Sequence, residues 1–159
     1  MLSSNYVIFQ RLKDIREDLD LMQQEMADLL NVSQSCYSRW ETGKELIPLR
    51  KLVDFCNITN HSLDYVTGLS NKKKTNTKKI ILNLDKIGKR LRKVRLENGL
   101  YQHQLAELLN TTQSTICAYE KGETLILTAF AYQIAKQFHI SLDELCGGIK
   151  KKEKETIKS

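Results

Sequence analysis

The sequence is poor in the residues that build turn-rich β structures. It holds one proline and seven glycines in 159 residues, which disfavours architectures of many short strands and favours helices. Hydrophobic residues make up 41% of the chain and charged residues 28%. This is an ordinary globular mixture, so general disorder is not expected. The length suits one domain or two small ones.

A long apolar run is also missing. The longest nearly apolar stretch near the N-terminus is Tyr6–Phe9. It is too short for the core of a signal peptide and far short of the roughly 20 residues that a membrane helix needs. We therefore expect a cytoplasmic protein without a membrane partner.

Signatures of catalysis and of metal binding are absent from the sequence as well. None of the four cysteines forms a CxxC pair, so neither a zinc knuckle nor a redox motif is indicated. The three histidines lack metal-ligand spacing, and neither a glycine-rich phosphate loop nor a nucleophile elbow is present. We therefore expect no enzyme, no catalytic residue, no metal and no cofactor.

The net charge of +6 is unevenly distributed along the chain. Residues 1–69 carry a net charge of −3, whereas residues 70–86 carry +5 and residues 148–159 carry +3. A basic excess suggests a polyanionic partner, but most of this excess lies outside the segments that look folded. The charge alone is therefore weak support for nucleic-acid binding.

An internal repeat organises the chain. Shifting the sequence by 79 residues aligns it with itself without a gap, and about a third of the positions from 11 to 68 are identical. We expect two tandem domains at 1–69 and 87–148, with a basic linker at 70–86 and a charged tail at 149–159.

The periodicity within each repeat is helical, and we expect five short helices per repeat. Asn31 suits the end of the second helix, Ser33 the N-cap of the third, and Gly43 its end. Residues 53–58 could form a strand on propensity alone, but their context favours a helix. Ser62 is expected to cap the fifth helix, with Asp64 near the positive end of that same helix.

The second and third helices of each repeat form the candidate functional element. Ala27 and Ala106 provide the small side chain that two steeply crossing helices need. Burial of the apolar positions leaves polar residues facing outward together near the start of the third helix. They are Gln34, Ser35, Ser38 and Arg39 in the first repeat, and Gln113 and Ser114, with Cys117 and Ala118, in the second. Such a helix suits the major groove, where Gln can read adenine and Arg can read guanine.

Residues 23–43 (QQEMADLLNVSQSCYSRWETG) and 102–122 (QHQLAELLNTTQSTICAYEKG) resemble the helix-turn-helix of the Cro/C1-type, or XRE, family of lambda-repressor-like DNA-binding domains. The resemblance implies an all-α fold of two tandem five-helix domains of that type. It also implies a phosphate contact for Gln23 and Gln102, and base contacts for the exposed polar residues of the third helices. Lys44 and Lys121 are further expected DNA contacts.

The same resemblance implies structural ion pairs, Arg16 with Glu41 and Arg95 with Glu120. There are departures from an exact duplication. Ala118 stands where the first repeat has Arg39, and residues 127–128 replace the Pro-Leu pair at 48–49.

Two functions remain open at this point. The first is a sequence-specific regulator of transcription, more specifically a repressor, that binds double-stranded DNA as a homodimer or as a pseudo-dimer within one chain. The alternative is an antitoxin-like or partner-binding protein, in which one repeat binds DNA and the other dimerises or holds a protein.

Overall fold

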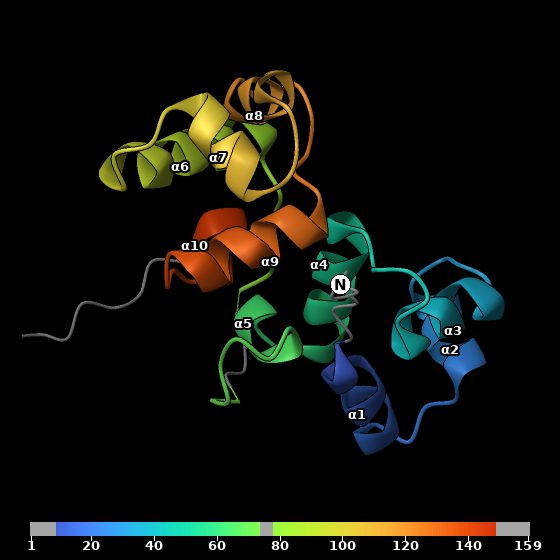
Figure 1. The fold of residues 1–159 in the computed structure, drawn as a ribbon. Helices are drawn as coiled ribbons and strands as arrows, with labels where there is room; N and C mark the ends of the chain where they lie inside the picture. The colour runs from blue at the N-terminus through green and yellow to red at the C-terminus, as the bar shows by residue number, and fades with distance from the viewer. Residues whose placement is uncertain (1–8, 74–77, 149–159) are drawn as a thin grey trace, which may run out of the picture.

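A computed structural model describes residues 9–73 and 78–148 (Figure 1). The tail expected at 149–159 and residues 74–77 of the expected linker lie outside the described residues. The described residues form ten α-helices, five in each repeat, so the all-α prediction is confirmed. Among these helices, none is both long enough and apolar enough to cross a membrane.

The helices follow the repeat in order, although α6 has 14 residues where α1 has nine. The first repeat contains α1 (Gln10–Asp18), α2 (Gln23–Leu29), α3 (Gln34–Thr42), α4 (Leu49–Thr59) and α5 (Leu63–Val66). The second contains α6 (Leu84–Glu97), α7 (Gln102–Leu108), α8 (Gln113–Glu120), α9 (Thr128–Gln137) and α10 (Leu142–Gly147). Residues 53–58, which could have been a strand, lie inside α4.

Local capping explains where the helices begin and end. The Ser33 hydroxyl accepts a hydrogen bond from the Cys36 N–H at the start of α3, and Ser62 does the same for α5. Asn31 has a φ of 57° after α2, and Gly43 has a φ of 75° after α3. Both conformations are left-handed, which Asn tolerates and Gly adopts without strain, so both helices stop there.

The segment between the repeats is partly folded. Helix α6 begins at Leu84, inside the range expected to be a linker, and Ile80 is 4% exposed. The Asn57 side chain of α4 holds the Ile80 backbone by donating to its carbonyl at 3.0 Å and accepting from its N–H at 2.8 Å. Burial of an apolar residue thus attaches this end of the segment to the first repeat.

The two repeats meet through α5 and α10. The N-terminus of each of these helices is capped by an aspartate carboxylate from the other helix. The Ser141 hydroxyl and the Leu142 N–H donate to Asp64 at 2.6 and 2.7 Å. In return, the N–H groups of Leu63 and Asp64 donate to Asp143 at 2.8 and 3.0 Å. Asp64 lies in the first turn of α5, as expected, but its carboxylate also caps α10 of the other repeat, which the sequence did not predict.

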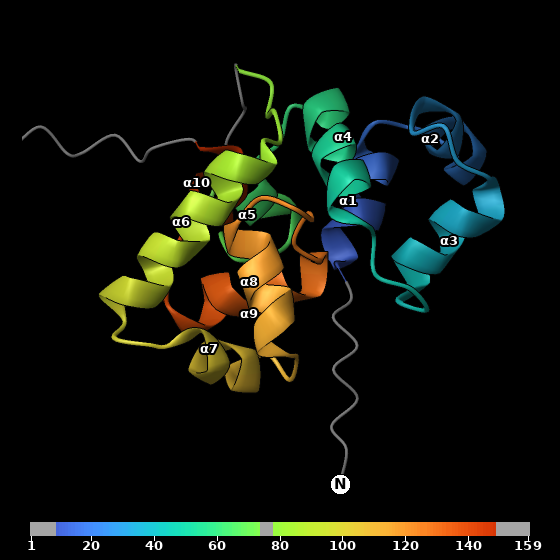
Figure 2. The ribbon, with the colours of Figure 1, turned by 90° about the horizontal axis from the view of Figure 1, so that it is seen from above.

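Two further contacts join the repeats. The Thr128 hydroxyl donates to the Ile47 carbonyl at 2.7 Å, and the rings of Phe9 and Tyr132 meet edge to face with centroids 5.5 Å apart. In Figure 1 the α2–α3 pair lies at one side of the molecule and the α7–α8 pair at the top, with α4 and α9 between them. Figure 2 also shows the two pairs well apart.

Candidate nucleic-acid interface

The two helix-turn-helix elements are built alike. After α2, the Val32 N–H donates to the Ala27 carbonyl at 3.0 Å, and after α7 the Thr111 N–H donates to the Ala106 carbonyl at 2.9 Å. The two alanines are 0% and 2% exposed, so a small side chain fills each close approach of helices. The third helix of each repeat is therefore held at a fixed crossing by its own second helix.

A buried ion pair joins α1 to the end of α3. The Arg16 Nε lies 2.6 Å from Glu41 Oε1, and its Nη2 donates to Oε2 at 3.2 Å. The remaining terminal nitrogen donates to the Leu21 carbonyl at 2.7 Å. The two side chains are 10% and 3% exposed, so this is a desolvated, two-pronged contact of the kind that fixes geometry.

The second repeat carries the same contact between α6 and the end of α8. The Arg95 Nε lies 2.5 Å from Glu120 Oε1, and its Nη2 donates to Oε2 at 3.2 Å. Arg95 also donates to the Leu100 carbonyl at 2.8 Å. Both pairs anticipated from the resemblance thus lie in contact, and each ties the C-terminal end of a third helix to the first helix.

In the first pair, each group stabilises the charged form of the other. The hydrogen bond from Arg16 to Glu41 raises the pKa of the guanidinium. Burial alone would raise the pKa of the Glu41 carboxyl, but hydrogen bonds from Arg16 and Gln23 outweigh it and hold that pKa below its ordinary value. Both groups are therefore charged at neutral pH.

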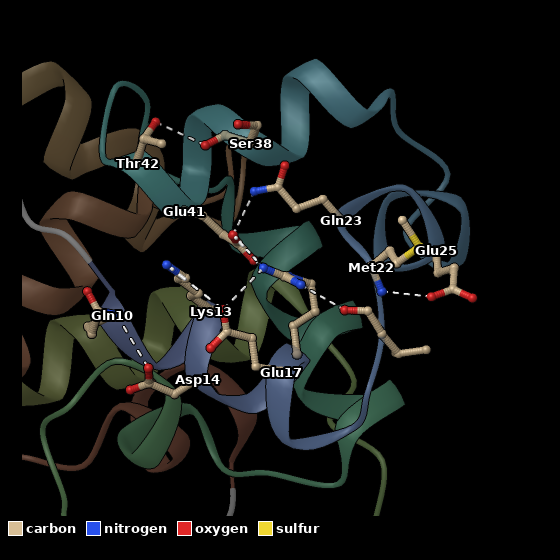
Figure 3. A network of polar contacts seen from close by, with 12 residues as sticks. Gln10, Lys13, Asp14, Glu17, Met22, Gln23, Glu25, Ser38, Glu41 and Thr42 are labelled. Carbon is tan, nitrogen blue, oxygen red and sulfur yellow. Dashed lines mark hydrogen bonds and ion pairs between the residues drawn. The ribbon is translucent and has the colours of Figure 1, made fainter.

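A glutamine from the start of the second helix completes each network. Gln23 Nε2 donates to Glu41 Oε2 at 2.8 Å (Figure 3), and Gln102 Nε2 donates to Glu120 Oε2 at 2.7 Å. Sequence reasoning gave these glutamines a phosphate contact and missed the internal bond. One amide N–H is used internally, so the amide carbonyl and the second N–H of each carry any external contact. The identical Gln-to-Glu spacing of 18 residues in both repeats was the available signal.

The start of α3 presents polar side chains to solvent. Gln34, Ser35 and Arg39 are exposed, and Ser38 is half-buried. The Ser35 and Ser33 hydroxyls lie 3.2 Å apart. Four of the expected contact residues are thus brought together on one helix, with Gln34 and Ser35 in its first turn, at the positive end of the dipole, and Arg39 in its last turn.

The start of α8 is similar but carries fewer functional groups. Gln113 and Ser114 are exposed, and the Ser114 hydroxyl lies 3.0 Å from that of Thr112. Cys117 and Ala118 are half-buried rather than fully outward. Lys44 and Lys121, which follow α3 and α8, are both exposed.

One contact on this surface was not anticipated. The Arg39 Nε lies 3.2 Å from Glu45 Oε1, and these side chains are 44% and 54% exposed. The Glu45 N–H also donates to the Arg39 carbonyl at 3.2 Å. Opposite charges on either side of the turn at Gly43 were the only signal in the sequence.

Comparison with known proteins places these elements in a family. The helix-turn-helix family model HTH_3 matches residues 12–66 and residues 91–145, one match in each repeat. The two matches together cover more than half of the chain and contain both buried ion pairs. They also contain every exposed polar residue of α3 and α8 described above.

Individual relatives match a single repeat's length. The uncharacterized HTH-type transcriptional regulator YqaE of Bacillus subtilis (strain 168) is 37% identical over 65 residues, which cover 40% of this chain and 56% of that protein. The regulator YobD of the same organism, also described as uncharacterized, is 31% identical over 61 residues, 38% of this chain and 54% of that protein. The matched segment thus spans little more than half the length of these relatives.

A solved structure is also similar. The crystal structure of a transcriptional regulator from Listeria innocua is 35% identical and has a TM-score of 0.38, with 43% of this chain and 64% of that chain covered.

Proposed function

The chain belongs to the helix-turn-helix family, with one copy of the domain in each repeat, and we propose that it is a transcriptional regulator that binds double-stranded DNA with α3 and α8. The observation that carries this proposal is duplicated: each third helix exposes polar side chains from its start, and a buried Arg–Glu–Gln network holds its C-terminal end. The names of the relatives, both HTH-type transcriptional regulators, support it.

Each of the proposed contact residues has a role that its chemistry suits. Gln34 and Gln113 can pair with the N6 and N7 edge of adenine, and Arg39 with O6 and N7 of guanine. Ser35, Ser38 and Ser114 supply hydroxyls that suit either bases or phosphates. Lys44 and Lys121 are cations at the edge of this surface and suit phosphates. Gln23 and Gln102 can contact DNA phosphates through their remaining amide atoms, and such contacts set the position of the protein on the duplex.

We further propose that one chain acts as a pseudo-dimer. The reciprocal contacts of Asp64 and Asp143 relate the two repeats by an approximate twofold pattern and support this arrangement. Two reading helices in one molecule would enter successive major grooves, about 34 Å apart. A protein seated across two grooves obstructs other proteins on the same DNA, which favours a repressor.

The domain boundaries belong to the same proposal. Residues 1–69 and 87–148 are the two DNA-binding domains, and residues 70–86 connect them. The buried Ile80 and the start of α6 at Leu84 favour a connection that is packed against the first repeat at Ile80 and helical from Leu84. A connection of this kind limits the relative movement of the two reading helices.

Selection of bound duplexes from a random pool, with the whole chain, tests the proposed function. We expect an enriched sequence with two half-sites. The double substitution Gln34→Ala with Ser35→Ala should abolish the preference at one half-site, and Gln113→Ala with Ser114→Ala at the other. No enrichment for the unmodified chain would refute the proposal. Loss confined to the first repeat's half-site would favour the alternative, a second repeat that binds a protein.

A further inference from the structure

We propose that Glu45 is a positioning residue that presents Arg39 to a guanine, so that the first repeat selects a G·C base pair for which the second repeat has no reader. This inference rests on the proposed function and adds to it the origin of a difference between the two half-sites. It follows from a contact on the exposed face of α3 that α8 does not share.

The contact has two parts. The side chains approach through Arg39 Nε and Glu45 Oε1 at 3.2 Å, and the backbone closes through the Glu45 N–H and the Arg39 carbonyl at 3.2 Å. Gly43, in the left-handed conformation with a φ of 75°, lets the chain turn back toward α3. Glu45 is thus held beside the arginine by the turn itself.

The pair is too exposed to matter for folding. Ion pairs between side chains about half exposed contribute little to stability, because water solvates both partners and salt screens them. The buried contact of Arg16 with Glu41 already fixes this end of α3. The effect of Glu45 is therefore to be sought in the orientation of Arg39.

The orientation suits guanine. Glu45 occupies the Nε side of the guanidinium, and within the described residues no hydrogen bond or ion pair engages the terminal Nη1 and Nη2 of Arg39. A guanidinium reads guanine by placing two parallel N–H groups on O6 and N7. Holding one side of the group in advance reduces the rotamer freedom that Arg39 loses on binding.

The second repeat lacks both partners. The corresponding side chains are Ala118 and Thr124, although the chain after α8 also turns back, with the Glu123 N–H donating to the Ala118 carbonyl at 3.0 Å. The methyl group of Ala118 cannot donate to a base. The two half-sites should therefore differ at this position, and a bound chain should have a defined direction on DNA.

Glu45 also has an electrostatic cost that separates its role from a structural one. Its carboxylate lies on the surface that faces DNA and repels phosphates, so it weakens binding to every sequence alike. Removal of the charge should therefore have opposite effects on two measurable quantities. Affinity for unrelated DNA should rise, whereas discrimination at the G·C pair should fall.

The test uses the full chain and three duplexes. The first carries the selected sequence, and the second carries the same sequence with the G·C pair that Arg39 is proposed to read changed to A·T. The third is unrelated in sequence and measures non-specific binding. The variants are Glu45→Gln, Arg39→Ala and both together. Glu123→Gln is the matched control, because it removes an exposed carboxylate from the corresponding loop of the second repeat. Thermal melting of each variant confirms that it is folded.

We expect Glu45→Gln to reduce the affinity ratio of the first two duplexes about 2- to 5-fold, the range of an exposed ion pair, while binding to unrelated DNA tightens. Glu123→Gln should tighten non-specific binding with the ratio unchanged. In the Arg39→Ala background, Glu45→Gln should leave the ratio unchanged.

An unaltered ratio in Glu45→Gln, or an equal fall in the Arg39→Ala background, would overturn the positioning role. Failure of the proposed function would look different, because the unmodified chain would then select no sequence at all.

Discussion

The buried ion pairs are the side-chain contacts on which the reading surface depends. Arg16 and Glu41 are both nearly inaccessible, and their charges are satisfied by each other, by Gln23 and by the Leu21 carbonyl. Removing one partner of such a pair leaves a buried charge without compensation, which costs far more than the pair itself contributes. Loss of either partner of the ion pair should therefore both destabilise a repeat and disturb the position of its reading helix.

Substitution of Glu41 tests this point. We expect Glu41→Ala to lower the free energy of unfolding by roughly 3–5 kcal/mol, because Arg16 is left charged and buried. Chemical denaturation followed by circular dichroism measures the change. Glu97→Ala is the control, since Glu97 pairs with Lys93 at 3.8 Å in an exposed contact that should contribute less than about 1 kcal/mol. Equal effects of the two substitutions would contradict the account.

At the scale of elements, the sequence predicts the helices better than their contacts. Ser33, Asn31 and Gly43 mark the ends of helices through local chemistry, and the structure uses them as expected. The exchange between Asp64 and Asp143 could not be predicted, because it depends on how two whole repeats pack. The link from Gln23 to Glu41 was missed for the same reason, since it joins residues 18 positions apart across a helix crossing.

The contact of α6 with α8 is sensitive to a single methyl group. A Cβ at Gly88 would lie 2.4 Å from the Tyr119 carbonyl oxygen and 2.6 Å from that of Glu120. Backbone cannot yield without moving the whole helix, so we expect Gly88→Ala to destabilise the protein by about 1–3 kcal/mol. The measurement is the denaturant midpoint. Lys89→Ala, on the exposed face of the same helix, should change stability by less than about 0.5 kcal/mol. A harmless Gly88→Ala would show that α6 and α8 are not so closely packed.

The exchanged caps of α5 and α10 predict a pH dependence. Burial raises the pKa of Asp143 to about 6, and the nearby Asp64 carboxylate adds to this increase, while backbone N–H donors oppose it. Between these two pKa values, about 3.9 in the unfolded chain and about 6 in the folded protein, Asp143 is therefore protonated in the folded protein and ionised in the unfolded chain. The stabilisation is present in full below the pKa of the unfolded chain and is lost as the pH rises through about 6.

The difference in unfolding free energy between the unmodified protein and Asp143→Asn isolates this effect. We expect the difference to fall by up to about 2 kcal/mol between pH 4 and pH 7, because one protonation step contributes about 1.4 kcal/mol per pH unit. Denaturation curves at several pH values measure it. A difference independent of pH, or one that grows toward neutrality, would be inconsistent with a raised pKa for Asp143.

At the scale of the molecule, the two repeats combine likeness in framework with difference in surface. The hydrogen-bond distances in the buried networks of Arg, Glu and Gln are nearly the same in the two repeats. The exposed faces differ, because the first repeat has Arg39 and Glu45 where the second has Ala118 and Thr124. The duplication and the family could be predicted from the sequence. The placement of α3 relative to α8 could not be predicted from the sequence, because it depends on the contacts between α5 and α10.

The dependence of affinity on half-site spacing tests the central claim most directly. Duplexes carrying the two selected half-sites at varied separations are titrated with the full chain in one salt concentration. A single molecule that holds both reading helices should bind most tightly at a centre-to-centre spacing of about 10–10.5 base pairs. An added half-turn of about five base pairs should weaken binding to the level of one half-site. Affinity that does not change with spacing would contradict the account.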